Sequence, residues 1–145
     1  MGVAEHKALA QRVFDDLMSQ GDLSLIDEIF APDVVAHDPG REMRGAASIK
    51  QGFAGLRVAF PDLRFTVEDM VAEGNKVAVR YTGQGTHHGE FWNTPPTGKS
   101  MRYTGILIWR FEEGKIAEHW AEPDLLSLLQ QLGVIPAQPA PLSPP

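Results

Sequence analysis

Apolar residues recur at every third or fourth position over much of the first sixty residues, which is the period of an α-helix. Leu9, Val13 and Leu17 form one such stripe, and Gly21 follows where a helix would end. A second stripe predicts a helix over residues 46–60. Between the two helices we expect a short helix before Pro32, a strand over residues 33–38 and a loop over residues 39–45.

After Leu63 the period changes to two, which is typical of β-strands with one buried face. Turns that contain glycine divide this half of the chain into adjacent strands. Two predicted strands begin at Leu63 and at Val77, and two more cover residues 101–111 and 115–122. A leucine-rich helix follows from Leu125 to Leu132. Helices followed by a meander of antiparallel strands predict an α+β fold, with the helices on one face of the sheet.

The longest predicted strand has one face that is almost entirely apolar. That face should look towards the helices, and Tyr103, Leu107 and Trp109 on it are candidates for the wall of a ligand pocket. The opposite face is half polar but carries Ile106 and Ile108. Because a face of this kind is common where two sheets pair, we expect a homodimer formed through the sheet.

His119 on the last strand is the main candidate for acid–base chemistry. The pattern leaves its direction open, because Ile116 and His119 belong to opposite faces of a regular strand. If His119 points inward, Ala117 and Ala121 beside it leave room for a ligand. A partly buried imidazole suits a general acid or base. The alternative is a structural histidine that forms a hydrogen bond within a packed sheet.

Three further residues are candidates for the same site. His37 lies beside Asp38, but neighbours on a strand point to opposite faces, so we expect Asp38 to tether the following loop. Asp124 begins the last helix, where it would either favour the helix dipole or act as a base at the edge of a cavity. Trp120 would be a pocket wall or part of the core.

The composition excludes several classes of protein. The 145 residues are enough for one domain, and we assign residues 1–135 to it and the proline-rich residues 136–145 to a flexible tail. There is no cysteine, which excludes disulfides and thiolate metal sites. The net charge of −6, without a basic stripe, argues against nucleic-acid binding. No apolar run could span a membrane or serve as a signal peptide, so we expect a cytoplasmic protein.

Several segments together resemble a known family. They are GREMRG, the helix end FPDLRF, the block GTHHGEFWNTPPTGKSMRYTGILIWRFEEGKIAEHW and the following PDLLSLLQQLG. The pattern is similar to that of the SnoaL-like polyketide cyclases of the ester cyclase type. These belong to the ketosteroid-isomerase-like, or nuclear transport factor 2-like, superfamily. The resemblance extends over about residues 5–134.

The resemblance implies a cone-shaped, curved antiparallel sheet packed on N-terminal helices around an apolar pocket. It also implies frequent homodimers and no metal or organic cofactor. The cyclases close the last ring of aromatic polyketides by an intramolecular aldol condensation, and other members isomerise or hydroxylate. The family's catalytic aspartate corresponds to Ala121 and its assisting histidine to Leu107, whereas His119, Trp120 and Asp124 match.

Three functions are open at this point, and the last of them is an interaction protein that would use the dimer face or the proline-rich tail. The first is a cofactor-independent enzyme that transfers protons next to a carbonyl group of an apolar, polyketide-like compound. His119 would be its acid or base, with His37 or Asp124 orienting the imidazole. The substrate-binding residues would be Tyr103, Leu107, Trp109, Trp120 and Ala121. The second is a non-catalytic protein that binds a small apolar molecule, which the missing aspartate favours.

Overall fold

The computed structural model describes residues 1–137 of the chain. The helical segments are α1 (Val3–Arg12), the π-helix η1 (Val13–Ser19), α2 (Leu25–Ile29), α3 (Ala46–Ala59) and α4 (Leu125–Leu132). The strands are β1 (Phe30–Asp38), β2 (Arg41–Arg44), β3 (Arg64–Glu73), β4 (Lys76–Thr86), β5 (Ser100–Glu112) and β6 (Lys115–Pro123). Most of the tail predicted for residues 136–145 lies outside the described residues. None of the helices described is long and apolar enough to cross a membrane.

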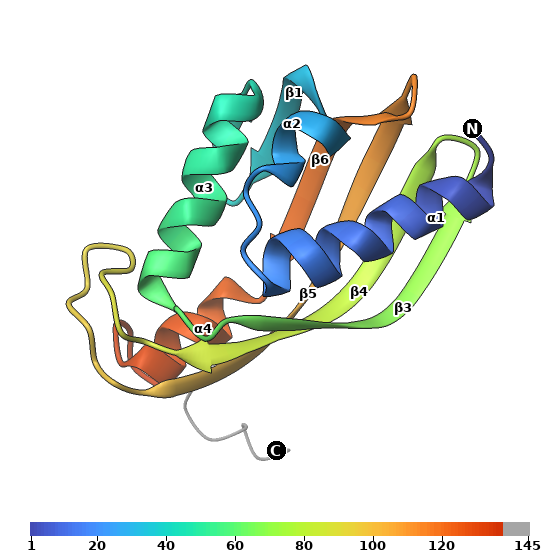
Figure 1. Cartoon of the computed structure of the whole chain (residues 1–145). Helices are drawn as coiled ribbons and strands as arrows, with labels where there is room; N and C mark the ends of the chain where they lie inside the picture. Colours follow the sequence, from blue (N-terminus) through green and yellow to red (C-terminus); the bar gives the residue numbers. More distant parts are fainter. Residues whose placement is uncertain (138–145) are drawn as a thin grey trace, which may run out of the picture.

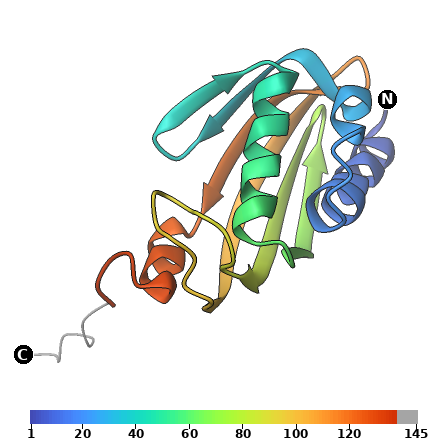
Figure 2. The same ribbon diagram turned by 60° about the vertical axis from the view of Figure 1, so that its left-hand side comes forward.

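A six-stranded sheet in the order β2-β1-β6-β5-β4-β3 forms the scaffold. Neighbouring strands are antiparallel except β1 and β6, which run parallel. The sheet curves without closing, and α1, η1 and α3 lie on its concave side (Figure 1). A second view shows α3 in front of the strands, with α4 at the end of the sheet where it packs against β5 (Figure 2). The predicted α+β fold, with a curved sheet packed on N-terminal helices, is confirmed.

The first two strands differ from the prediction, although β1 ends at Asp38 as expected. Residues 39–45, predicted as a loop, contain β2, which pairs antiparallel with β1. Gly40 turns the chain between the two strands with a φ of +76°, which glycine adopts without strain. β2 is too short and too highly charged to show an apolar alternation, as is typical of an edge strand. β1 already begins at Phe30, because the chain passes from α2 directly into the sheet.

A β-bulge decides which residues of β6 face the helices. Between two neighbouring pairs of β5 and β6, the last strand has one residue more than its partner, and Ala117 is the extra one. Ile116 and His119 are therefore both buried on the concave side, although a regular strand would place them on opposite faces. The bulge also keeps Glu118 away from the concave side, where a buried carboxylate without a partner would be costly.

Two tyrosines on the concave face lie across glycines of the neighbouring strand. Tyr81 of β4 lies over Gly105 of β5, and Tyr103 of β5 lies over Gly83 of β4. A Cβ atom at position 105 would stand 2.5 Å from the Tyr81 hydroxyl oxygen, so any larger residue would displace the ring. The space beside Gly105 is therefore filled by a side chain of the chain itself.

Candidate active site

His119 lies on the concave face between a tryptophan and a carboxylate. Its Nδ1 accepts a hydrogen bond from the indole N–H of Trp109, with 2.6 Å between the two nitrogens. Its Nε2 lies 3.4 Å from Oδ1 of Asp38. Only 9% of His119 is exposed, and Trp109 is fully buried. The imidazole is thus held from both sides at a place that bulk water scarcely reaches.

Asp38 reaches this site because of its position in β1. Val34 and Ala36 of that strand are buried, and Asp38 follows on the same face. Ala36 also pairs with His119 of the parallel strand β6, so the end of β1 lies next to the imidazole. The sequence pointed to the neighbouring His37 and assigned Asp38 to the loop. Strand alternation was the signal that could have found Asp38, since one of two adjacent residues must face inward.

Two buried phenols complete the polar groups of this face. Burial raises the pKa of Tyr81 above its ordinary value, and the negative charge of Asp38 raises it further. Burial also raises the pKa of Tyr103, with a smaller contribution from Tyr81. Both phenols stay protonated at neutral pH and can donate hydrogen bonds. Tyr81 was missed from the sequence because its position looks like any buried site of an alternating strand.

Four of the five residues expected to bind substrate share the concave face with His119. They are Tyr103, Leu107, Trp109 and Ala121, and all are buried. The fifth, Trp120, lies on the opposite, convex face, where its ring stacks on that of His37 with the centroids 5.5 Å apart. The apolar pocket around His119 remains a prediction.

His37 belongs to the convex face and does not reach His119. Its Nε2 lies 2.7 Å from the carboxylate of Glu118, and its Nδ1 lies 3.5 Å from that of Glu42. The Nε–H of Arg110 donates to the other oxygen of Glu118 at 3.3 Å. His37 is therefore part of a surface ion network, and Asp38 is the residue placed to orient His119.

Asp124 does not contact His119 either. Its carboxylate accepts a hydrogen bond of 3.1 Å from the backbone N–H of Ser127 in the first turn of α4, and its side chain is exposed. Its backbone N–H donates to the carbonyl of Thr104, which ties the start of α4 to β5. Of the two roles that the sequence allowed, the geometry gives Asp124 the structural one.

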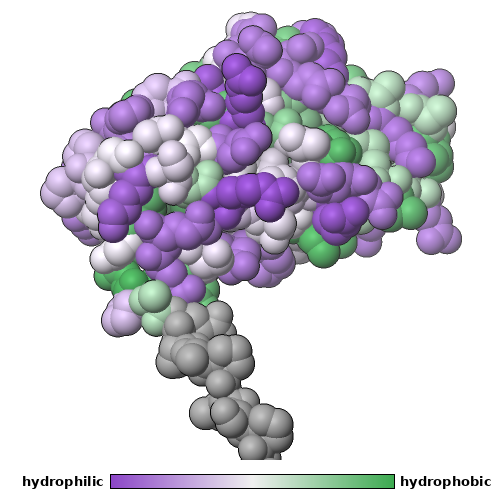
Figure 3. Space-filling view, turned by 90° about the horizontal axis from the view of Figure 1, so that it is seen from below, coloured by the Kyte–Doolittle hydropathy of each residue, from purple (hydrophilic) through white to green (hydrophobic). Residues whose placement is uncertain are grey.

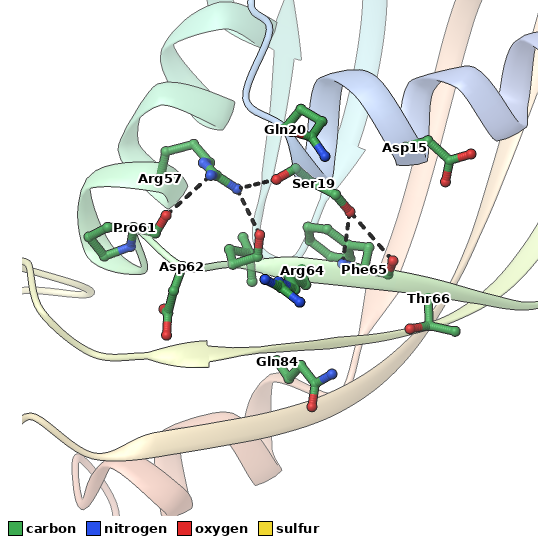
Figure 4. Close-up of a pocket in the computed structure, with 11 residues that line it drawn as sticks. Asp15, Ser19, Gln20, Arg57, Pro61, Asp62, Arg64, Phe65, Thr66 and Gln84 are labelled. Atoms are coloured by element: carbon green, nitrogen blue, oxygen red, sulfur yellow. Dashed lines mark hydrogen bonds between the residues drawn. The ribbon is translucent and has the colours of Figure 1, made fainter.

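A surface depression of about 770 Å³ lies elsewhere, where the end of η1 meets the end of α3 and the start of β3 (Figure 4). Its lining includes Arg57, whose guanidinium donates to four backbone carbonyls. These belong to Met18, Ser19, Pro61 and Leu63. The arginine therefore holds three segments of the chain together, and few of its donors are left for a ligand. This depression is separate from the Asp38–His119 pair.

The carboxylate and imidazole on the concave face can move a proton between them and a bound molecule. A carboxylate can take a proton from carbon, and an imidazole N–H can donate one to oxygen. Burial strengthens the interactions of His119, which is 9% exposed, more than those of Asp38, whose side chain is 23% exposed. Within residues 1–137, no three His, Asp or Glu side chains lie close enough together to hold a metal ion.

The fold and this pair define a small α+β protein with a buried histidine beside a carboxylate on the concave face of a curved sheet. The profile of the SnoaL-like polyketide cyclases matches residues 8–132, and the chain belongs to this family, as predicted.

Known relatives agree with this assignment. Aklanonic acid methyl ester cyclase DauD of Streptomyces sp. (strain C5) is 29% identical over 110 residues, covering 75% of this chain and 67% of that protein. Aklanonic acid methyl ester cyclase DnrD of Streptomyces peucetius is 30% identical over 107 residues, covering 73% of this chain and 72% of that protein. The crystal structure of AclR, a candidate hydroxylase from Streptomyces galilaeus, has a TM-score of 0.85 and 35% identity, covering 95% of this chain and 87% of that chain.

The ion network on the convex face predicts how stability depends on pH. The hydrogen bond with His37 lowers the pKa of Glu118 below its ordinary value, and Arg110 adds to this effect. A lowered carboxyl pKa stabilises the fold above the unfolded-state pKa, and the stabilisation is lost as the pH falls through the folded-state pKa. We predict that Glu118→Gln lowers the free energy of unfolding by about 1 kcal/mol at neutral pH and by much less in acid.

Urea unfolding of the wild-type and variant proteins, from neutral pH into acid, measures the difference in their free energies of unfolding. Glu112→Gln is the matched control, because Glu112 also contacts Arg110 but its side chain is 67% exposed. We expect this control to change the free energy of unfolding little at any pH. A loss for Glu118→Gln that is as large in acid as at neutral pH would contradict the prediction.

Proposed function

We propose that this protein is an enzyme that transfers protons next to a carbonyl group of an apolar, polyketide-like compound, without a cofactor. The observation that carries the proposal is the pair of Asp38 and His119 on the concave face, 3.4 Å apart. Two relatives bear the name aklanonic acid methyl ester cyclase, so this ester is the first substrate to test. We place the activity in the cytoplasm, as the sequence led us to expect.

In this proposal Asp38 supplies the catalytic carboxylate that position 121 lacks. The family resemblance puts the cyclases' catalytic aspartate at Ala121 of β6. His37 pairs with Trp120 between the parallel strands β1 and β6, so Asp38 and Ala121 are the next residues along the two strands. Both follow the alternation onto the concave face. In this proposal the carboxylate of the site lies on β1, whereas the family resemblance puts the carboxylate of the cyclases on β6.

The reaction begins when the pair removes a proton from the carbon next to the substrate carbonyl. The enolate oxygen that forms receives a hydrogen bond from the site, and the absence of bulk water makes this hydrogen bond stronger. In a cyclisation, the enolate carbon attacks a second carbonyl carbon of the same molecule, a carbon–carbon bond forms, and the proton passes to the new alkoxide oxygen. In an isomerisation, the proton returns to a different carbon.

Incubation with aklanonic acid methyl ester, followed by mass spectrometry and NMR of the product, tests the proposal. Cyclisation and isomerisation leave the mass of the substrate unchanged, whereas a hydroxylation adds one oxygen atom. We predict that Asp38→Asn and His119→Gln each lower turnover by about 100-fold to 10,000-fold. His37→Gln is the control and keeps turnover, because the ring of His37 lies on the convex face.

The competing function is a binding protein that holds an apolar molecule without changing it. A ligand at 100 times its dissociation constant adds about 2.7 kcal/mol to the free energy of unfolding, so a thermal melt detects it. If the wild-type protein is stabilised by the ester but returns it unchanged, the enzyme proposal fails and the binding function is supported. Equal turnover by the wild-type and His119→Gln proteins would contradict the assigned site.

We also propose that two copies of the chain pair through the convex face. A row of residues crosses this face from β3 to β6, and its members are Val71, Ala78, Ile108 and Trp120. Beside this row Ile106 is 52% exposed, and Ile108 within it is 37% exposed. The view from below shows hydrophobic patches between hydrophilic residues on the surface (Figure 3). A second copy would remove apolar surface of this kind from water.

Analytical ultracentrifugation of the full chain measures this association. We predict a dimer for the wild-type protein and a shift towards monomer for Ile106→Lys, because a buried charge without a partner disfavours the interface. Val58→Lys on α3 is the matched control, since Val58 is also exposed but lies on a helix on the other side of the sheet. A monomeric wild-type protein, or a dimer that Ile106→Lys leaves intact, would contradict the proposal.

A further inference from the structure

The hydrogen bond between Trp109 and His119 can have only one direction. An indole N–H donates and has no acceptor, so Nδ1 of His119 must be the acceptor and carries no proton. A neutral imidazole without a proton on Nδ1 holds it on Nε2. Nε2 is the nitrogen that lies 3.4 Å from Oδ1 of Asp38. The tryptophan on one side thus decides which group faces the carboxylate on the other.

The indole is itself fixed by its surroundings. Trp109 is fully buried, and Phe14 of η1 packs against it with the ring centroids 5.4 Å apart. Trp109 also pairs directly with His119 between β5 and β6. Because both side chains are almost shielded from bulk water, water does not replace the bond between them.

We infer that Trp109 is a positioning residue, which holds His119 in the tautomer that carries its proton on Nε2. The catalytic meaning of this inference rests on the proposed function. In that reaction the Nε2–H of His119 points toward Oδ1 of Asp38 and orients the carboxylate, and Asp38 takes the proton from carbon. The other tautomer would direct a nitrogen lone pair at the Asp38 carboxylate, and two acceptors would face each other.

Nitrogen NMR of the ligand-free protein tests the inference directly. Long-range proton–nitrogen correlations in a protein labelled with ¹⁵N-histidine show which ring nitrogen carries the proton, and the spectrum of His119→Gln assigns His119 among the five histidines. We expect Nε2 of His119 to be protonated and Nδ1 to be bare in the wild-type protein. In Trp109→Phe the ratio of the two tautomers should fall by about threefold to tenfold, which corresponds to the loss of one hydrogen bond.

A second variant keeps the test decisive where Trp109→Phe disturbs the fold. The chain has three tryptophans. In a W92F/W120F background, replacing tryptophan by benzothienylalanine exchanges only the indole N–H of Trp109 for sulfur and keeps the ring shape. We expect the same fall in the tautomer ratio relative to the W92F/W120F protein that carries natural tryptophan at position 109, with both proteins labelled with ¹⁵N-histidine. Trp92→Phe alone leaves the ratio unchanged because Trp92 is an exposed loop residue.

Two results would overturn the inference. They are a wild-type His119 with its proton on Nδ1, and a tautomer ratio that does not change when the indole N–H is removed. The measurement needs no substrate, so it is independent of turnover. A protein that converts no carbonyl compound but shows the expected tautomer would refute the proposed function and leave the positioning role of Trp109 intact.

Discussion

The extra residue in β6 is the constraint on which the site depends. A regular strand that buries Ile116 would also turn Glu118 and Glu122 towards the core. A carboxylate buried without a partner costs several kcal/mol, so this arrangement would lose more than the bulge loses in ladder hydrogen bonds. The extra residue Ala117 reverses which of the following residues face the core. His119 therefore points inward, and both carboxylates stay on the convex side.

This single shift gives the two faces of the sheet different properties. On the concave face, Asp38, His119 and Trp109 form a continuous line of contacts across three strands. On the convex face, His37 and Glu118 join a surface ion network next to exposed apolar residues. The family's scaffold is thus retained, and the carboxylate beside His119 belongs to β1. The proton transfer proposed for one side and the self-association proposed for the other would use neighbouring residues of the same strands.

Much of the fold could be predicted from the sequence, because period and composition report burial directly. The stripe of Leu9, Val13 and Leu17 is buried or partly buried as expected, and the apolar face of β5 with Trp109 looks inward. The charged edge strand β2 gave no apolar signal. The bulge at Ala117 lies in the pairing of β5 with β6, and the alternating pattern alone allowed either face of β6 to point inward. The arrival of Asp38 beside His119 depends on pairing between strands that are about eighty residues apart, which local pattern does not encode.

The contact between Asp38 and His119 can be tested by a double-mutant cycle on stability. The free energy of unfolding in urea is measured for the wild-type protein, Asp38→Ala, His119→Ala and the double variant. If the two side chains face each other as described, their effects are coupled by about 0.5 to 3 kcal/mol. Effects that add to within about 0.3 kcal/mol would mean that the two residues do not interact, and the site would not exist in this form.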